Sequence, residues 1–231
     1  MEGIGAGIYR AFSRLLGFDP EIWDIVLLSL RVSGTASLLA AAVSLPLAYI
    51  ITQNHFPGRR ALLGLCQSLM AIPAVVLGLV LYMLLSRSGP LGPWGWLYSP
   101  KAMILGQTLL ALPLMTSLAA SAFSNVDRNL KETMLTLGAG RIQALWGVVR
   151  EAKLALSAAF ITGLSRVLGE AGMAMMIGGN IRGRTRVMTT AIALETMKGN
   201  FELGLALGLV LLFVAVVINL VWQLIQGRAG Q

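Results

Sequence analysis

The stretch LGLALGLVLLFVAVVINLVWQLI, residues 203–225, carries no charged residue and is long enough to cross a lipid bilayer as one helix. Other largely apolar stretches of suitable length precede it, at about residues 25–52, 61–85, 102–123 and 155–177. Each is continuously apolar and does not alternate with polar residues, which excludes a transmembrane β-barrel. The sequence therefore predicts an all-α, polytopic membrane protein with five transmembrane helices.

The composition supports a membrane protein. Of the 231 residues, 56% are hydrophobic and only 12% are charged, whereas soluble domains have about 25% charged residues. The net charge of +8 would also suit a nucleic-acid-binding protein. The basic residues, however, lie singly between apolar runs, which is typical of loops that flank membrane spans. We therefore expect this chain to contact a lipid bilayer and no nucleic acid.

The residue types that carry most enzyme chemistry are scarce. The single cysteine, Cys66, cannot form an internal disulfide, and the single histidine, His55, leaves no His/Cys metal cluster. No Ser/His/Asp or Cys/His set can be assembled, and no G-x-x-x-x-G-K-[ST] loop is present to bind ATP phosphates. The chain itself is thus expected to be no enzyme and to hold no metal or cofactor.

Two segments lie outside the five spans and have a character of their own. Residues 1–20 are predicted to form an amphipathic helix on the membrane interface, because Arg10 and Arg14 interrupt the apolar positions before a signal-peptide core can form. Residues 22–226 would form the transmembrane domain. Within it, residues 124–154 are the only long hydrophilic segment, and we expect two short helices joined by a turn there.

The charge distribution does not orient the chain in the membrane. Five spans place the two ends on opposite sides. If the loop 53–60, the segment 124–154 and the C-terminus share one side, Lys and Arg are equally numerous on both sides. The positive-inside rule therefore gives no answer.

The hydrophilic segment carries a recognisable motif. Glu132 and Gly138 stand at the spacing of E-A-A, three residues and Gly, and Val148 stands where the pattern has Ile. In these positions the segment resembles the cytoplasmic "EAA" loop of ABC-transporter importer permeases. The sequence departs from the family pattern at Thr133, Met134, Arg150 and Glu151.

Further matches to this family follow one another in the expected order along residues 25–225. They are SLPLAY at 44–49, FPGRR at 56–60, Ile72-Pro73, SGPLG at 88–92 and SRVLGEAG at 165–172. These segments resemble the molybdate/tungstate/sulfate oxyanion branch. The compact five-span form, with GGNIRGR at residues 178–184, is most similar to tungstate-type permeases.

This resemblance implies the type I importer permease (MetI-like) fold in the cell (inner) membrane, with the N-terminus outside and the C-terminus inside. It implies import of an oxyanion, with tungstate expected and molybdate, sulfate or phosphate as alternatives. The implied partners are a second copy of the chain, two cytoplasmic ATPase subunits that hold ATP and Mg, and an external substrate-binding protein.

The resemblance also places the contact with the ATPase in the segment 124–154, as a cytoplasmic coupling loop. The residues implied there are Glu132, Gly138, Ala139, Arg141, Ile142 and Leu145. The glycines would permit a tight turn, and Glu132 would anchor the loop through charge-assisted hydrogen bonds. A simple interfacial hairpin between spans is the alternative for this segment.

Charged residues inside the predicted spans are the remaining candidates. Arg166 and Glu170 stand four residues apart, so we expect an intramembrane ion pair on one helix face. Arg31 has no acid within one helical turn, and with Ser33 and Thr35 it is a candidate for the translocation path, because a guanidinium donates in a planar fork to an oxyanion. The alternative for Arg31 is snorkelling to the headgroups.

The arginines that follow the fourth span, Arg182, Arg184 and Arg186, leave three roles open: contact with an acidic face of the binding protein, attraction of anions, or contact with lipid headgroups. A function of another class, an ATP-independent channel or secondary transporter, would predict activity without a partner and internal repeats of broken helices, of which the sequence gives no clear sign.

Overall fold

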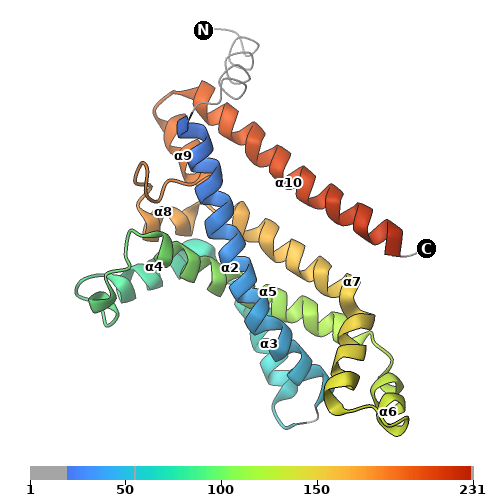
Figure 1. Ribbon diagram of the computed structural model, residues 1–231. Helices are drawn as coiled ribbons and strands as arrows, with labels where there is room; N and C mark the ends of the chain where they lie inside the picture. Colours follow the sequence, from blue (N-terminus) through green and yellow to red (C-terminus); the bar gives the residue numbers. More distant parts are fainter. Residues whose placement is uncertain (1–19, 55, 230–231) are drawn as a thin grey trace.

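The computed structural model describes residues 20–54 and 56–229, and within this part the regular structure is entirely helical, as predicted (Figure 1). The elements are α2 (Pro20–Gln53), α3 (Arg59–Leu69), α4 (Ala74–Leu85), the 3₁₀ helix η1 (Gly92–Trp94), α5 (Pro100–Ser124), α6 (Arg128–Thr136), α7 (Arg141–Leu168), α8 (Gly172–Gly178), α9 (Met188–Met197) and α10 (Phe201–Ala229). The interfacial helix predicted at residues 1–20 lies outside the described residues, except for Pro20, where α2 begins.

Among the described residues, three helices are long and apolar enough to cross a membrane unaided: α2, α5 and α10. Two further pairs of helices, α3 with α4 and α7 with α8, meet the same condition if each pair is counted as one span. The five predicted spans thus correspond to three unbroken helices and two bent pairs, by length and composition.

The second predicted span, residues 61–85, is not one straight helix. It is divided into α3 and α4, which meet at 96°. Pro73 accounts for the break, because proline has no N–H to donate and disfavours helical backbone at the residue before it. The last turn of α3 tightens, with the Ile72 amide donating to the Leu69 carbonyl at 3.2 Å, and Pro73 then adopts extended backbone before α4.

The fourth predicted span, residues 155–177, also differs from expectation at both ends. Its helix begins earlier, at Arg141, so the second short helix expected within 124–154 is the first part of the long helix α7. It then ends at Leu168, and α8 follows at an angle of 63°. The first short helix is separate, as expected, and is α6.

Small side chains hold the centre of the molecule together. α2 lies along α5, and α5 lies against α7. α2 buries a row of small residues at intervals of about one turn: Ser33, Ala36, Ala40, Ser44 and Ala48. Such residues let helix backbones approach closely, which is the usual source of helix association in membranes, where lipid removes the hydrophobic driving force.

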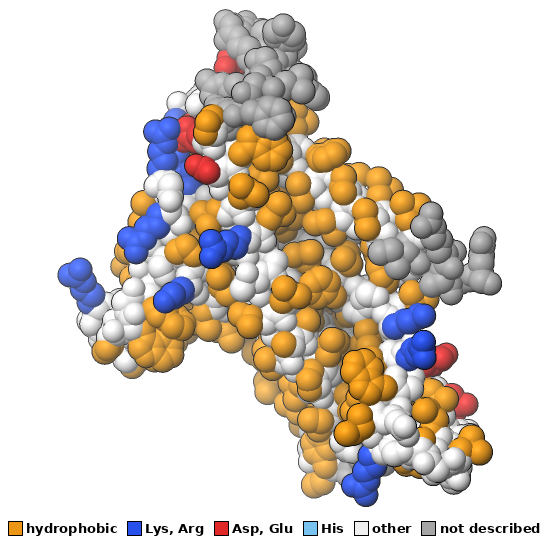
Figure 2. Space-filling model, in the orientation of Figure 1, with side chains coloured by type: hydrophobic (Ala, Val, Ile, Leu, Met, Phe, Trp, Pro, Cys, Tyr) orange, Lys and Arg blue, Asp and Glu red, His pale blue; other side chains and the backbone are white. Residues whose placement is uncertain are grey.

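The two ends of this bundle differ in chemistry. α6 lies at one end, whereas α8, α9 and the loop that joins them lie toward the other, which we call the α8–α9 end (Figure 1). Apolar side chains cover the middle of the visible face, and Lys and Arg side chains gather toward the two ends (Figure 2). α10 packs against α9 and diverges from the other helices toward its C-terminus.

Candidate functional site

The end formed by α6 and the start of α7 is built by two helix caps and a tight turn. Asp127 begins α6 by accepting a hydrogen bond from the Asn129 amide on its carboxylate, at 2.9 Å. α6 ends in a Schellman motif: the Ala139 amide donates to the Met134 carbonyl at 2.9 Å, and the Gly138 amide donates to the Leu135 carbonyl at 3.1 Å. Gly138 has φ +89°, a left-handed conformation that favours glycine.

The start of α7 is fixed just after this turn. The Gln143 side chain accepts a hydrogen bond from the Gly140 amide at 2.8 Å and thereby satisfies one of the donors at the N-terminus of the helix. Only Gly138 and Ala139 lie between the C-cap of α6, Leu137, and the N-cap of α7, Gly140. The predicted turn at Gly138 and Gly140 is present.

α6 rests directly on α7 through one methionine and one glycine. A Cβ at Gly147 would meet the sulfur of Met134, so the Met134 side chain packs into the space that the glycine leaves open. Beside this contact lies a groove of about 580 Å³. Its lining comprises Met134, Gln143, Trp146, Gly147, Val149, Arg150 and Lys153.

A second contact fixes α6 to α2. The Lys131 ammonium lies 5.8 Å from the centre of the Tyr49 ring, within reach of a cation–π interaction. The Tyr49 ring in turn packs edge-to-face on Phe123 at 5.5 Å. α6 thus contacts both α2 and α7.

The surface of this end is apolar but not suited to lipid tails. Leu137 is 82% exposed, Ile142 74% and Trp146 64%. The charged residues Glu132 and Arg141 are exposed beside them. We call the three exposed apolar side chains Leu137, Ile142 and Trp146 the docking patch, because an apolar surface among charges is typical of a protein interface.

The six residues predicted for ATPase coupling all lie at this end. Glu132, Gly138, Arg141 and Ile142 are exposed, whereas Ala139 and Leu145 are half-buried. Among the side chains that the structure describes, none forms a hydrogen bond or ion pair with the Glu132 carboxylate.

Arg166 and Glu170 lie in contact, at the break between α7 and α8. Arg166 Nη1 donates to Glu170 Oε2 at 3.0 Å. Glu170 follows the end of α7, and its other carboxylate oxygen accepts from the Met173 amide at 3.2 Å, in the first turn of α8. The pair therefore joins the two helices of the bend, rather than lying on the face of one unbroken helix.

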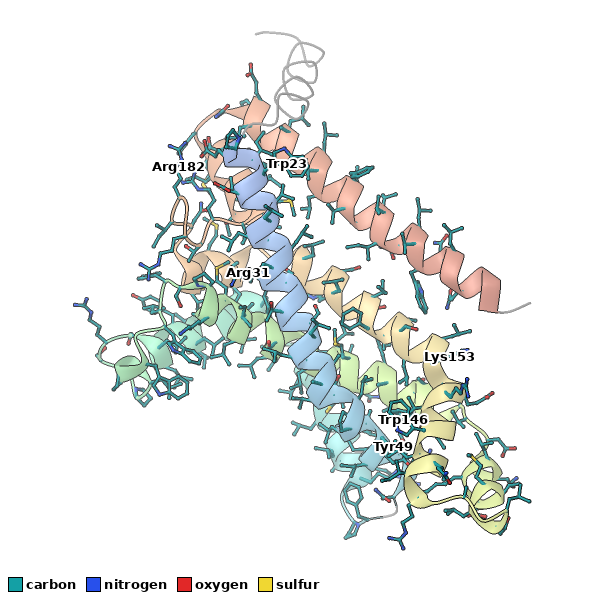
Figure 3. The ribbon with its side chains drawn as sticks, viewed as in Figure 1. Trp23, Arg31, Tyr49, Trp146, Lys153 and Arg182 are labelled. Atoms are coloured by element: carbon teal, nitrogen blue, oxygen red, sulfur yellow. The ribbon has the colours of Figure 1, made fainter. Side chains whose placement is uncertain are left out.

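The three candidates on α2 do not share one surface. Arg31 and Thr35 are exposed, whereas Ser33 is buried on the opposite side of the helix. Arg31 borders a cavity of about 440 Å³. Its other charged lining residues are Lys101 and Arg184. Figure 3 shows Arg31 midway along the molecule, with Arg182 toward the α8–α9 end and Trp146 and Lys153 at the α6 end.

The three arginines after α8 have different surroundings. Arg182 donates to Glu21 Oε2 at 2.6 Å, and Arg186 lies 3.7 Å from Glu21 Oε1. Arg184 forms no ion pair with a described residue. Of the three, only Arg184 lines the cavity beside Arg31.

Two features of the candidate site escaped sequence reasoning. The first is Gly147, whose role depends on the sulfur of Met134 in another helix. The second is Lys101, which joins Arg31 and Arg184 only through the packing of α5 beside α2. No group of three or more His, Cys, Asp or Glu residues suited to a metal ion occurs within residues 20–54 and 56–229.

Comparison with known proteins gives a consistent result. The family model described as "Binding-protein-dependent transport system inner membrane component" matches residues 42–230. The tungstate uptake system permease protein TupB of Peptoclostridium acidaminophilum is 42% identical over 221 residues, which cover 96% of this chain and 97% of that protein. A probable anion ABC transporter permease protein of Haloferax volcanii is 38% identical, over 85% and 87% of the two chains.

The fold has a close counterpart among solved structures. A bacterial ABC transporter involved in the import of the acidic polysaccharide alginate superimposes with a TM-score of 0.77, over 96% of this chain and 84% of the other. The sequence identity is 18%, so the likeness is one of fold.

Proposed function

Because this chain belongs to the family of inner membrane components of binding-protein-dependent transport systems, we propose that it is the permease subunit of an ATP-driven importer that moves tungstate into the cytoplasm. The observation that carries the choice of ion is the 42% identity to a tungstate uptake permease, over nearly the full length of both chains. As a transport subunit of the inner membrane, the chain performs no hydrolysis. ATP and Mg are held by a separate ATPase chain.

The docking patch and the turn beside it form the contact with that ATPase. An exposed apolar patch on a short, well-capped helical corner fits a groove on a partner. Glu132 and Arg141 flank the patch and offer charged groups to the ATPase, while Gly138 and Ala139 form the turn. Ile142 inserts into the partner, and Leu145 supports it from α7. Motion of the ATPase then reaches α2 through Lys131 and Tyr49.

The complete importer contains two copies of this chain, two ATPase subunits and one external substrate-binding protein. The α6 end faces the cytoplasm, where ATP is available, and the α8–α9 end faces the binding protein outside. The N-terminus is then outside and the C-terminus inside. Apolar side chains left exposed on the bent pair α3–α4 support a second copy and lipid as neighbours: Leu65, Leu69, Val76, Leu79 and Met83.

Within each copy, charged residues take two roles. Arg31, with Thr35 on the same side of α2 and Ser33 about half a turn away on the packed side, contributes to the path of the anion. Arg166 and Glu170 compensate each other's charge, at 3.0 Å, which is needed because a lone charge in the membrane costs about 2.5–3.5 kcal/mol on insertion scales. Their pairing also fixes the bend between α7 and α8.

Tungstate accumulation by cells tests the proposed ion. A strain that lacks this permease but keeps the ATPase and binding protein is complemented with the wild-type chain, and intracellular tungsten is measured by mass spectrometry. We expect accumulation to return and to persist in a tenfold excess of sulfate. An excess of molybdate should lower the uptake of isotopically labelled tungstate less than the same excess of unlabelled tungstate does. Preferential accumulation of molybdate or sulfate would assign the chain to another oxyanion.

A further inference from the structure

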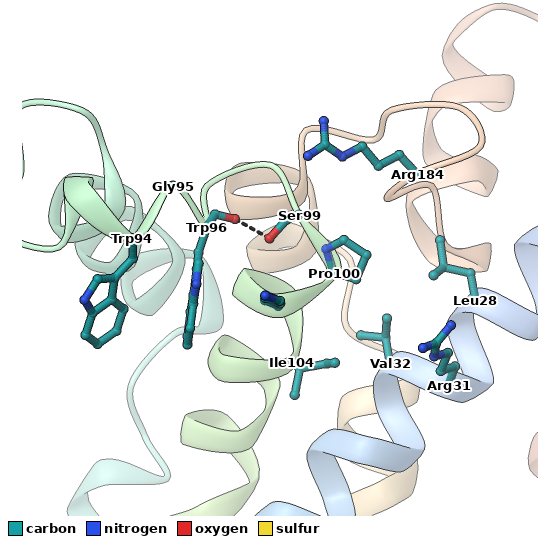
Figure 4. Close-up of a pocket in the computed structure, with 11 residues that line it drawn as sticks. Leu28, Arg31, Val32, Trp94, Gly95, Trp96, Ser99, Pro100, Ile104 and Arg184 are labelled. Atoms are coloured by element: carbon teal, nitrogen blue, oxygen red, sulfur yellow. Dashed lines mark hydrogen bonds between the residues drawn. The ribbon is translucent and has the colours of Figure 1, made fainter.

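The cavity beside Arg31 is lined by three cationic side chains from three separate parts of the chain. Arg31 comes from the first half of α2, Lys101 from the first turn of α5 and Arg184 from the loop between α8 and α9. The cavity has a volume of about 440 Å³, and no carboxylate lines it. Figure 4 shows Arg31 and Arg184 extending from two different segments on either side of Pro100.

Four other basic side chains of this half of the molecule have acidic partners. Glu21 forms ion pairs with Arg182 and Arg186. Glu195 pairs with Lys198 at 3.0 Å, and Glu170 pairs with Arg166. None of the described carboxylates pairs with a cation of the cavity. Three like charges around one space repel one another, so a bound anion lowers their energy.

The backbone around the cavity adds to this positive potential. α5 begins at Pro100, and no side chain caps its N-terminus. Ser99 stands at the capping position, but its hydroxyl donates to the Trp96 carbonyl. The N-terminus of a long helix carries partial positive charge, which acts here in the same direction as the three side chains.

Aromatic and apolar side chains form the remaining walls. Trp94 and Trp96 pack on each other at 4.8 Å between ring centres, and the Lys101 ammonium lies 6.0 Å from the Trp96 ring. Leu28 and Ile104 complete the apolar part. Arg31, Lys101 and Arg184 are all exposed to solvent, so the cavity is open and an anion can reach the three charged groups directly and form charge-assisted hydrogen bonds with them.

We propose that this cavity is a binding site for a free tetrahedral oxyanion, in which Arg31, Lys101 and Arg184 hold the anion at the α8–α9 end before it enters the membrane. The proposal rests on the proposed function, because it takes tungstate as the anion that is delivered there. Arg31 and Arg184 donate in planar forks, which fit two oxygens of a tetrahedral anion, and Lys101 supplies a point charge. Release from the binding protein would thus be followed by capture on the permease.

Direct binding of tungstate to the purified permease–ATPase complex tests the site. The complex is prepared without binding protein in a maltoside detergent, which has no phosphate, and tungstate binding is measured by equilibrium dialysis. We expect saturable binding of one anion per permease, and a loss of about tenfold or more in affinity in Arg31→Gln, Lys101→Gln and Arg184→Gln. Lys101→Arg, which keeps the charge, should retain most of the affinity.

The matched control is Arg87→Gln. Arg87 is an exposed arginine of the 86–99 segment that does not line the cavity, so its loss removes the same charge without touching the site. Tungstate affinity should stay at the wild-type value. Thermal unfolding and gel filtration of every variant show whether lost binding comes from lost folding.

Three other outcomes would overturn the site. Equal tungstate affinity in all variants, or none in the wild type, excludes a free oxyanion. If only co-purified lipid phosphorus falls in the three variants, the cavity holds a lipid headgroup. If only the affinity for the binding protein falls, the three cations form a docking surface for an acidic protein. Saturable binding of molybdate in place of tungstate keeps the site and changes the proposed ion.

Discussion

Gly138 shows how one residue shapes the end of the molecule that we propose as the contact with the ATPase. Its φ of +89° lets α6 end at Thr136 and α7 begin at Arg141, with only four residues between the two helices. A side chain with a Cβ pays about 1–2 kcal/mol in this conformation, except that Asn adopts it readily. The space around Gly138 is otherwise open, so the backbone conformation alone makes glycine necessary.

This argument predicts a difference between two substitutions at the same position. Gly138→Val should lower ATP hydrolysis stimulated by the tungstate-loaded binding protein several-fold, because it disturbs the turn that carries the docking patch. Gly138→Asn should retain most of the stimulation. Stimulated ATPase activity of the reconstituted complex is the measurement. Equal loss in both variants would mean that side-chain size, and not backbone conformation, matters there.

Gly89 is constrained by close approach. A Cβ at this position would lie against the carbonyl oxygen of Met83 and 2.6 Å from that of Leu84, and backbone atoms cannot move aside as a side chain can. Gly89→Ala should therefore destabilise the complex by about 1–3 kcal/mol and lower its apparent Tm. Gly34→Ala is the matched control, because nothing lies within 4 Å of the added carbon, and an unchanged Tm in both variants would refute the packing argument.

At the scale of elements, the docking patch can be compared with an equally exposed apolar side chain in another part of the molecule. Ile142 at the α6 end is 74% exposed, and Met197 at the end of α9 is 72% exposed. Ile142→Ser should weaken binding of the ATPase subunit about tenfold, within the range for a buried interface residue. Met197→Ser should leave it unchanged. Co-purification and surface plasmon resonance report both, and equal affinities would remove the patch from the interface.

The corner between α9 and α10 is held by a buried carboxylate. Glu195 accepts from Lys198 Nζ and from Asn200 Nδ2, each at 3.0 Å. Burial acts to raise the pKa of Glu195, but these hydrogen bonds and the charges of Lys198 and Arg186 outweigh it and lower the pKa below the ordinary glutamate value. The carboxylate therefore contributes stability above the ordinary pKa, and this contribution is lost as the pH falls through the lowered value.

Glu195→Gln should thus lower the apparent Tm of the complex at neutral pH. The difference from the wild type should shrink as the pH falls through the lowered pKa of Glu195, because both side chains are then neutral. Thermal unfolding across a pH series measures it. Glu151→Gln, at an exposed carboxylate, serves as control, and a difference that persists in acid would point to packing instead of charge.

The helices show what hydropathy can and cannot predict. All five apolar stretches were correctly assigned as helical, since length and composition suffice for that. The breaks were not predicted, because a proline does not by itself end a helix in a packed bundle: Pro46 and Pro113 lie within unbroken α2 and α5, whereas Pro73 separates α3 from α4. Neighbouring helices decide whether the freed backbone groups find other partners.

At the scale of the whole molecule, some contacts of the candidate site could be predicted from the sequence and others could not. The turn at Gly138 and the contact of Arg166 with Glu170 were predictable, because each depends on residues near one another in the sequence. The cavity of Arg31, Lys101 and Arg184 was not, because the three lie on separate elements and meet only through helix packing. Because Lys and Arg are equally numerous on the two sides of the membrane, the orientation of the chain could be inferred only from the family resemblance.

The molecule thus joins two ends of different chemistry through a core of small, closely packed residues. The apolar docking patch lies at one end and the cationic cavity nearer the middle, beside the loop between α8 and α9, and α2 passes from Arg31, at the cavity, to Tyr49, beside Lys131 of α6. One continuous helix, α2, therefore connects the proposed ATPase contact with the proposed anion site.

Uptake of tungstate into proteoliposomes tests this connection most directly. The permease and its ATPase are reconstituted together, tungstate-loaded binding protein is placed on one side and ATP on the other, and transported tungsten is measured by mass spectrometry. We predict accumulation that requires ATP, the ATPase subunit and the binding protein together. Tungstate movement that persists without ATP or without the ATPase subunit would contradict an ATP-driven importer and identify the chain as a channel or secondary transporter.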